Sequence, residues 1–332
     1  MLGASHLSEF TARFSVVFDQ KVNSKLKHHA TNAGLGHNSS MDITEQPAFT
    51  PEQQASILAL AHAAEKYDGV SPLNEEATLA ISHGTGRHLL AQDDGHLVGY
   101  AYADDADSAA QIVVDPPHRR QGIATHLVAQ LAHPDLWAFG NVEPAQYFCA
   151  SQGYAPVRGI LVMERKTTVD GGDPDCARMT GADRITTFVP SDLQDLVELN
   201  ARSFADHPEQ GQMTIDDFTA RMESDWFDPE GLLIAKDEDG TMTGFHWTKV
   251  EDGIGEVYVL GVDPHHTGSG LGTRLLNAGL TYLASRNVST VRLWVDDDNH
   301  IAQSLYMKSG FSPIRGDIRY RRVDEDGRKS HE

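Results

Sequence analysis

Cysteine is scarce in this chain, which has two among 332 residues, Cys149 and Cys176. Two cysteines exclude a disulfide framework and a four-cysteine zinc site, and they fit a reducing compartment, so we expect a cytoplasmic protein. The sequence also lacks an apolar run of about 18 residues, and its start lacks an apolar stretch followed by a small-residue cleavage site. It therefore predicts neither a membrane span nor a secretory signal.

Positive charge is scarce too, because 27 Lys and Arg residues stand against 48 Asp and Glu residues and the formal net charge is −21. Such a surface repels phosphate backbones, so non-specific nucleic-acid binding is not expected. It does not prevent backbone N–H groups from holding one small anion. The 17 histidines are scattered without cysteines or carboxylates at metal-ligand spacing, and we expect no metal site.

The body of the chain contains an internal repeat. The segment IVVDPPHRRQGIATHLVAQLA from Ile112 aligns with LGVDPHHTGSGLGTRLLNAGL from Leu260, and similar segments precede and follow both in the same order. Three matched segments in one order indicate a duplicated domain, and the chain is long enough for a core in each copy. The predicted parts are a disordered extension at 1–41, a first domain at 42–166, a linker at 167–182, a second domain at 183–325 and a tail at 326–332.

Each repeat has the pattern of an α+β domain, in which a helix is followed by a strand–turn–strand, a strand, a helix, a strand, a helix and a strand. A Thr-Pro start and a run of helix formers predict a helix from Thr50 to Tyr67. The dipeptides Asp94-Gly95 and Asp239-Gly240 lie between apolar runs and predict hairpin turns. In both repeats a β-branched strand ends where a glycine-containing loop begins.

The glycine loops are typical of anion binding at the start of a helix. A dinucleotide-binding fingerprint would need a glycine where Thr273 stands, and a P-loop would need a lysine that neither loop has. The third alternative is the acetyltransferase pyrophosphate loop, Gln/Arg-x-x-Gly-x-Gly/Ala, to which we compare Arg119–Ala124 and Thr267–Gly272. In all three alternatives small residues let the backbone approach the anion, and unpaired N–H groups at the helix N-terminus hold it.

A second motif follows the second loop, where DNHIAQSLYMKSGF contains Asn299, then Tyr306, then Gly310-Phe311. The two motifs together resemble the GNAT acetyltransferase superfamily, whose closing helix and strand read Asn-x-x-Ala/Ser-x-x-x-Tyr-x-x-x-Gly-Phe. The resemblance implies two tandem GNAT (acyl-CoA N-acyltransferase) domains, each a mixed central sheet flanked by helices, that bind acetyl-CoA. It also implies that Asn299 contacts the pantetheine arm of acetyl-CoA and that the Tyr306 hydroxyl faces its sulfur.

The two repeats differ at the positions that carry chemistry. We expect Cys149 to stand where the second repeat has Tyr306, and Gln111 to stand where it has Glu256. A carboxylate can accept a proton from an amine, whereas an amide cannot. A cysteine side chain is too short to reach the point that a tyrosine hydroxyl reaches. We therefore expect the second domain to be catalytic and the first to be non-catalytic.

Further motifs, namely DGVSP followed by Glu75, then HPEQG, WFDPEGLL, GFHWTK and GEVYVLGVDP, resemble the mycothiol synthase family of actinobacteria over about residues 50–325. The resemblance implies an acyltransferase that moves acetyl from acetyl-CoA to the cysteine amine of 1-D-myo-inositol 2-(L-cysteinylamino)-2-deoxy-α-D-glucopyranoside, in the last step of mycothiol biosynthesis. Glu256 would be the general base and Tyr306 the general acid in a direct attack on the thioester. This small molecule is the expected partner, and we expect a monomer.

The same resemblance implies the residues that bind each substrate. Acetyl-CoA in the second domain would contact Leu260, Gly261, Val262, Thr267, Gly268, Ser269, Gly270, Leu271, Gly272, Thr273, Asn299, His300, Ile301, Ala302, Gln303 and Ser304. A second acetyl-CoA in the first domain would contact Ile112, Val113, Val114, Arg120, Gln121, Gly122, Ile123, Ala124 and Thr125. The acceptor would contact Glu75, Glu209, Lys249, Glu256 and Trp294.

Two positions depart from the family pattern. Thr267 replaces the usual glutamine or arginine, which weakens charge neutralisation at the diphosphate. Trp294 replaces a tyrosine, so an indole N–H that donates without accepting stands in place of a hydroxyl. Two other functions stay open, a tandem GNAT enzyme for another amine, such as an aminosugar antibiotic or a protein N-terminus, and a non-catalytic acetyl-CoA sensor. The presence of Glu256 and Tyr306 argues against the sensor.

Overall fold

The computed structural model describes residues 41–103, 109–167, 184–205, 207 and 210–323. The predicted extension up to residue 40, the linker from 168 to 182 and the tail at 326–332 lie outside the described residues. All described residues belong to one compact unit. The domain boundaries drawn from the sequence stay predictions.

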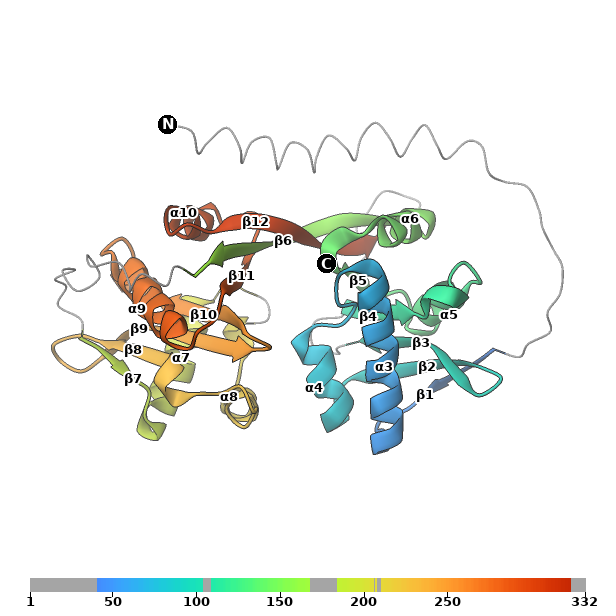
Figure 1. Cartoon of the computed structure of the whole chain (residues 1–332), viewed down its shortest axis with the longest axis horizontal. Helices are drawn as coiled ribbons and strands as arrows, with labels where there is room; N and C mark the ends of the chain where they lie inside the picture. Colours follow the sequence, from blue (N-terminus) through green and yellow to red (C-terminus); the bar gives the residue numbers. More distant parts are fainter. Residues whose placement is uncertain (1–40, 104–108, 168–183, 206, 208–209, 324–332) are drawn as a thin grey trace. The chain divides into compact units, whose positions relative to one another are not determined.

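The two halves of this unit contain the same elements in the same order (Figure 1). The first half comprises β1 (Asp42–Glu45), α3 (Pro51–Asp68), α4 (Glu75–His83), β2 (Arg87–Asp93), β3 (His96–Ala103), β4 (Ala109–Val114), α5 (Ile123–Gln130), β5 (Asp135–Ala138), α6 (Glu143–Ser151) and β6 (Tyr154–Lys166). The second half comprises β7 (Arg184–Thr187), α7 (Leu193–Ser203), α8 (Ile215–Met222), β8 (Leu232–Lys236), β9 (Met242–Glu251), β10 (Ile254–Val262), α9 (Leu271–Ser285), β11 (Thr290–Asp296), α10 (His300–Lys308) and β12 (Ser312–Arg322). This correspondence confirms the internal repeat and the α+β class, with one strand and one helix at the start of each half beyond those expected.

The halves exchange their last strands within one mixed sheet. Among the described residues this sheet has 12 strands in the order β1-β2-β3-β4-β5-β12-β6-β11-β10-β9-β8-β7. The second half's β12 pairs with β5 of the first half, and the first half's β6 pairs with β11 of the second. The two exchanged strands also pair with each other (Figure 1). Each half therefore completes its sheet with a strand from the other half.

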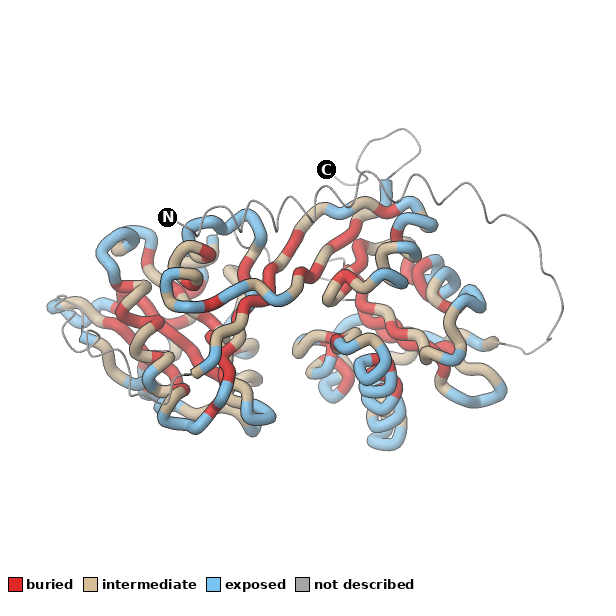
Figure 2. The backbone as a smooth tube through the Cα atoms, turned by 45° about the horizontal axis from the view of Figure 1, so that its top comes forward, coloured by how far each residue is buried: buried red, intermediate tan, exposed pale blue. Residues whose placement is uncertain are grey.

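Helices cover both faces of the sheet in the first half, and buried residues lie between helices and strands (Figure 2). On one face α3 packs Ile57 into a core with Tyr100 of β3. On the other face α5 and α6 contribute Leu127 and Cys149 to a core that also contains Tyr320 of the exchanged strand β12. Burial of these apolar side chains is the main force that holds the layers together.

The second half repeats this layering with its own residues. Phe218 of α8 stacks on Trp247 of β9 with ring centres 5.6 Å apart on one face. On the other face Leu276 of α9 and Tyr306 of α10 share a core with Met163 of the exchanged strand β6. In each half, the core on one face of the sheet therefore includes a side chain from the other half's last strand.

Local sequence accounts for the ends of the first helix and for the hairpins. The side chain of Thr50 accepts a hydrogen bond from Gln53 N–H, and the Gln53 side chain closes a capping box at the start of α3. Gly69 ends this helix with φ +76°, a left-handed conformation that favours glycine. The hairpins β2–β3 and β8–β9 form at the two predicted turns. These local predictions are confirmed.

Candidate active sites

The parallel strands β10 and β11 separate just after Glu256. They pair for three residues, ending at Glu256 opposite Arg292, although β10 continues to Val262 and stays paired with β9. Beyond Glu256 no ladder contact to β11 is present in the described residues, so one edge of β10 keeps N–H and C=O groups for a ligand. Leu260–Val262, predicted to contact acetyl-CoA, lie on this open edge.

The loop after β10 places two glycines directly before α9. Gly268 and Gly270 have φ of +77° and +81°, and a Cβ at either position would meet open space. The first-turn N–H groups of α9, including those of Gly272 and Thr273, have no partner within the helix. The 15-residue helix also adds partial positive charge at this end. The loop therefore suits a diphosphate, because the glycines have no side chains to block its approach to the backbone N–H groups.

Several side chains of this loop serve the fold instead of a ligand. Thr267 Oγ1 donates to the Pro264 carbonyl at 2.9 Å, and Ser269 Oγ donates to the His266 carbonyl at 2.6 Å. Leu271 is buried in a core. An anion would meet these residues through their backbone N–H groups.

The first half has an equivalent gap and loop beside a cavity of about 390 Å³. β4 and β5 pair in parallel for two residues, and Gly122, with φ +84°, precedes α5 as Gly270 precedes α9. Arg120 has φ +66°, a costly conformation for a residue with a side chain. Of the residues predicted to bind the second acetyl-CoA, those that line this cavity are Ile112, Val113, Val114, Arg120, Gly122, Ile123, Ala124 and Thr125; Gln121 does not. Arg119, which was not predicted, lines it too, but its guanidinium is paired with Asp68 at 2.7 and 2.8 Å.

In the second half, charged and aromatic side chains surround Lys249. Its Nζ lies 2.6 Å from Glu75 Oε1 and 3.0 Å from Glu251 Oε2, and 4.9 Å from the centre of the Trp226 ring. Lys249 stands on β9 directly opposite Glu256 on β10. Glu75 is the first residue of α4, so the first half supplies a carboxylate to the second. Three of the five predicted acceptor residues, Glu75, Lys249 and Glu256, thus gather in one cluster.

A β-bulge in β10 adds Tyr258 to this cluster. The register with β9 shifts between Val257 and Val259, so Tyr258 is the extra residue. Its hydroxyl donates to Glu75 Oε2 at 2.7 Å and accepts from Arg221 Nε at 2.9 Å. In the first half β4 pairs with β3 without such a shift. The bulge therefore distinguishes the second half from the first at the strand that carries Glu256. The registers also correct one expectation: Gln111 pairs with Tyr102 as Val259 pairs with Trp247, so Ala109, and not Gln111, stands at the position of Glu256.

The surroundings of Glu256 suit a proton acceptor. Desolvation raises the pKa of its carboxyl group to about 8; Lys249 lowers that pKa, while Glu75 and Glu251 raise it. Part of the Glu256 surface still reaches solvent. Desolvation alone would lower the pKa of Lys249, but the nearby carboxylates outweigh it and the pKa of Lys249 is raised. A carboxyl group that titrates near neutral pH beside a fixed cation is matched to general-base work.

Tyr306 on α10 is buried and remains protonated at neutral pH. It is 8% exposed, its ring lies edge-on to Phe311 at 5.9 Å, and burial raises the pKa of its hydroxyl to about 12. Asn299 caps the same helix, because its Oδ1 accepts from Ala302 N–H at 3.0 Å. At the corresponding place in the first half, burial raises the pKa of the Cys149 thiol to about 12. Neither a thiolate nor a tyrosine hydroxyl is therefore available there.

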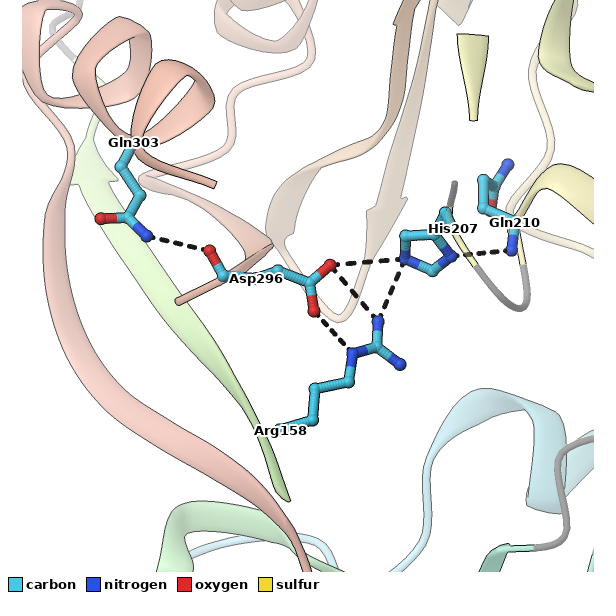
Figure 3. Close-up of polar contacts among 5 residues, drawn as sticks. All are labelled: Arg158, His207, Gln210, Asp296 and Gln303. Atoms are coloured by element: carbon cyan, nitrogen blue, oxygen red, sulfur yellow. Dashed lines mark hydrogen bonds and ion pairs between the residues drawn. The ribbon is translucent and has the colours of Figure 1, made fainter. Parts of the chain in front are cut away.

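A second polar cluster ties the exchanged strand β6 to the end of β11 (Figure 3). Arg158 of β6 pairs with Asp296 of β11, with Nε 2.6 Å from Oδ1. His207 Nε2 lies 3.6 Å from Asp296 Oδ2, and its Nδ1 accepts from Gln210 N–H at 3.0 Å. Gln303 Nε2 donates to the Asp296 carbonyl at 2.9 Å. The Gln303 side chain, which is 2% exposed, thus anchors α10 to β11, and His207 makes structural contacts within this cluster.

Trp294, another predicted acceptor residue, stands outside the Lys249 cluster. Trp294 on β11 is 42% exposed and lines a cavity of about 130 Å³ together with Asn74 and Gln111 of the first half. Glu209 lies outside the described residues. Ile301, predicted to contact acetyl-CoA, is 88% exposed, so it leaves an apolar surface at the start of α10.

Four members of the cluster around Lys249 were not predicted from the sequence, namely Glu251, Tyr258, Arg221 and Trp226. A signal existed for two of them, because residues two apart on a strand share a face. Glu251 follows Lys249 by two positions, and Tyr258 follows Glu256 by two. Arg221 and Trp226 arrive from α8 and the segment after it, and no local pattern indicates their destination.

Two kinds of feature are absent from the described residues. None of their helices combines the length and the apolar character that crossing a membrane requires. They also contain no group of three or more His, Cys, Asp or Glu side chains placed to hold a metal ion.

Comparison with known families and structures assigns the fold to both halves. Residues 193–311 match the Acetyltransferase (GNAT) family, and residues 84–156 match an Acetyltransferase (GNAT) domain. A GCN5-related N-acetyltransferase from Sphaerobacter thermophilus has a similar structure, with a TM-score of 0.65 at 23% identity over 84% of this chain and 94% of that one. A tandem GNAT protein from the clavulanic acid biosynthesis pathway reaches 0.64 at 18% identity over 84% and 97%. The fold is two tandem GNAT domains, as predicted, and GNAT acetyltransferases use acetyl-CoA.

Relatives in sequence narrow the family. A mycothiol acetyltransferase from Propionibacterium freudenreichii subsp. shermanii is 42% identical over 281 residues, which are 82% of this chain and 89% of the relative. One from Kytococcus sedentarius is 41% identical over 293 residues, 85% of this chain and 98% of the relative. One from Thermomonospora curvata is 42% identical over 285 residues, 82% of this chain and 94% of the relative. Similarity of this degree over most of both chains shows that this protein belongs to the mycothiol acetyltransferase family.

Proposed function

We propose that this protein acetylates the cysteine amine of 1-D-myo-inositol 2-(L-cysteinylamino)-2-deoxy-α-D-glucopyranoside with acetyl-CoA, forming mycothiol, as a cytoplasmic monomer that needs no metal. The observation that carries the proposal is the carboxyl group of Glu256, whose pKa is raised to about 8 at the residue where β10 and β11 separate. The acceptor is inferred from the relatives, which are named mycothiol acetyltransferases.

Glu256 takes the proton from the acceptor's ammonium group, directly or through one water molecule, so that the amine attacks the thioester carbonyl. The N–H groups on the open edge of β10, around Leu260–Val262, stabilise the oxyanion that forms; one such donor is commonly worth about 3–4 kcal/mol. Tyr306 then protonates the departing thiolate, since its hydroxyl keeps its proton at neutral pH. No covalent enzyme intermediate is needed.

Glu75, Lys249 and Glu256 bind the acceptor in this proposal, together with Trp294 and Glu209. The support is the cluster itself, in which a buried lysine and several carboxylates offer donors and acceptors to a polyhydroxylated amine. Carboxylates also favour the cationic form of the acceptor on arrival.

The first half binds a second acetyl-CoA without transferring its acetyl group. The support is a cavity next to a helix N-terminus, in a half that has Ala109 at the position of Glu256 and the buried thiol of Cys149 at the position of Tyr306. An alanine side chain cannot accept the proton. This half contributes to the acceptor site of the second half by supplying Glu75.

The deciding experiment measures coenzyme A release with acetyl-CoA and the cysteinyl pseudo-disaccharide, beside simple amines and aminoglycosides. Turnover confined to the cysteinyl compound is expected. Preference for another amine would leave the fold and the chemistry intact and overturn the acceptor. A sensor would bind acetyl-CoA and release no coenzyme A with any acceptor, and Tyr306→Phe would then change nothing.

A further inference from the structure

Gln111 lies on β4 of the first half, and its amide makes a paired contact with Asn74. Its Oε1 accepts from Asn74 N–H at 2.9 Å, and its Nε2 donates to Asn74 Oδ1 at 2.8 Å. Gln111 is 4% exposed, so water does not compete freely for these bonds. An amide can make both bonds because it carries a donor and an acceptor on the same group, whereas an ionised carboxylate has no donor.

Asn74 connects this contact to the start of α4. It is the N-cap of the helix, and its Oδ1 also accepts from Ala77 N–H at 2.9 Å. The next residue is Glu75, whose two carboxylate oxygens contact Lys249 Nζ and the Tyr258 hydroxyl at 2.6 and 2.7 Å. One peptide bond therefore separates the residue that Gln111 holds from the residue that reaches the other half.

We propose that Gln111 is a positioning residue for the acceptor site of the second half, acting through Asn74 to aim Glu75 at Lys249 and Tyr258. A strand residue of the first half would thus serve the acceptor site of the second half. A glutamate in place of Gln111 would still accept from Asn74 N–H but would repel Asn74 Oδ1. The inference rests on the proposed function, since the acceptor is the substrate whose binding it concerns.

The test compares Gln111→Glu and Gln111→Met with the parent protein in the coenzyme A release assay. We expect the KM for the acceptor to rise about tenfold, with the KM for acetyl-CoA within about twofold of the parent, because none of the residues expected to bind acetyl-CoA in the second half belongs to α4. Tyr320→Phe is the matched control. It removes another buried hydrogen bond of the first-half core, from Tyr320 Oη to Asn141 Oδ1 at 2.8 Å, and should change neither KM.

A double-mutant cycle distinguishes positioning from general loosening of the fold. In a Glu75→Gln background, Gln111→Met should raise the acceptor KM by less than about twofold, because its route to the site is already weakened. Asn74→Asp keeps the cap and an acceptor for Gln111 Nε2 and should stay near the parent. Additive effects in the cycle, or equal losses for both substrates, would overturn the inference.

The control experiments separate this inference from the proposed function. If the parent protein does not acetylate the cysteinyl compound, the proposed acceptor is wrong, and the same cycle is run with the amine that does react. If the parent is active and Gln111→Met leaves the acceptor KM unchanged, the inference alone fails. Should Gln111→Glu not fold, Gln111→Met and Asn74→Asp decide, with thermal melts verifying that both are folded.

Discussion

Glu256 is a single residue whose usefulness depends on charges contributed by residues far from it in the chain. Desolvation raises the pKa of its carboxyl group to about 8 against the pull of Lys249 and Arg292, with Glu75 and Glu251 adding to the rise. A general base must be deprotonated to act, so kcat/KM should increase as pH rises through about 8 in the free enzyme. The pH profile of coenzyme A release checks this; a profile flat from pH 6.5 to 9 would contradict it.

Replacing Glu256 with glutamine should remove the base and leave the shape of the side chain. We expect Glu256→Gln to lower kcat by about 10²–10⁴, since that is the usual contribution of general-base catalysis. Glu251→Gln is the matched control, because it belongs to the same cluster but is 58% exposed as a side chain. That variant should lose less than about threefold. An equal loss of kcat in the two variants would show that the rate depends on the total charge of the cluster and not on a general base at Glu256.

Glu256→Gln should lower activity but raise the stability of the folded protein. The pKa of Glu256 is higher in the folded protein than its usual value of 4.5, so the group favours folding at low pH, and that contribution is lost as pH rises from about 4.5 through 8. Glu256→Gln should therefore melt about 2–4 °C above the parent protein at pH 8.5, with a smaller gap at pH 6. Thermal melts of the variant and the parent at both pH values check this prediction. A difference in melting temperature that becomes smaller as pH rises would contradict it.

At the scale of elements, the loop between β10 and α9 combines a backbone conformation with an approach path. Gly270 has φ +81°, and Gly240, in the β8–β9 turn, has φ +83°; beyond the adjoining residues, a Cβ added to either would have no atom within 4 Å. Alanine should cost either position about 1 kcal/mol of folding stability. Only Gly270→Ala should also raise the KM for acetyl-CoA, by about tenfold or more, because its Cβ enters the diphosphate's approach. A similar KM for both variants would show that this loop does not bind the diphosphate.

At the scale of the whole molecule, the exchanged strands make the two halves depend on each other. Met163 lies on β6 of the first half, yet it is 1% exposed within the core of the second half. Arg319 and Arg321 lie on β12 of the second half, yet both pair with Asp135 of the first half at 2.8 Å. Neither sheet is complete without the other half's last strand, so we expect the halves to unfold together.

Calorimetry of Met163→Ala tests this dependence. Truncating a buried methionine typically costs about 2–5 kcal/mol, and the whole heat-absorption peak should move to lower temperature as one transition. Leu276→Ala, a truncation within the second half's own core, provides the comparison and should behave alike. Two separate transitions, of which Met163→Ala moves one, would show that the halves unfold independently despite the exchange.

Features whose signals are local could be predicted from the sequence. The Thr50 cap, the hairpin turns and the glycines before α5 and α9 depend on neighbouring residues, so their positions could be predicted. The repeat was visible because both copies keep the same order of local patterns. Lys249 and Glu256 were found through a family resemblance, and their roles in the reaction stay predictions.

Contacts between residues far apart in the chain could not be predicted and are seen only in the folded protein. Glu75 and Lys249 are 174 positions apart, and Gln111 and Asn74 are 37 apart, so no periodicity records either contact. The exchange of β6 and β12 is equally hidden, because a strand's pattern gives its buried face but not the strand that it pairs with. The raised pKa of Glu256 follows from these placements, since desolvation and charge depend on which side chains surround a carboxyl group in space.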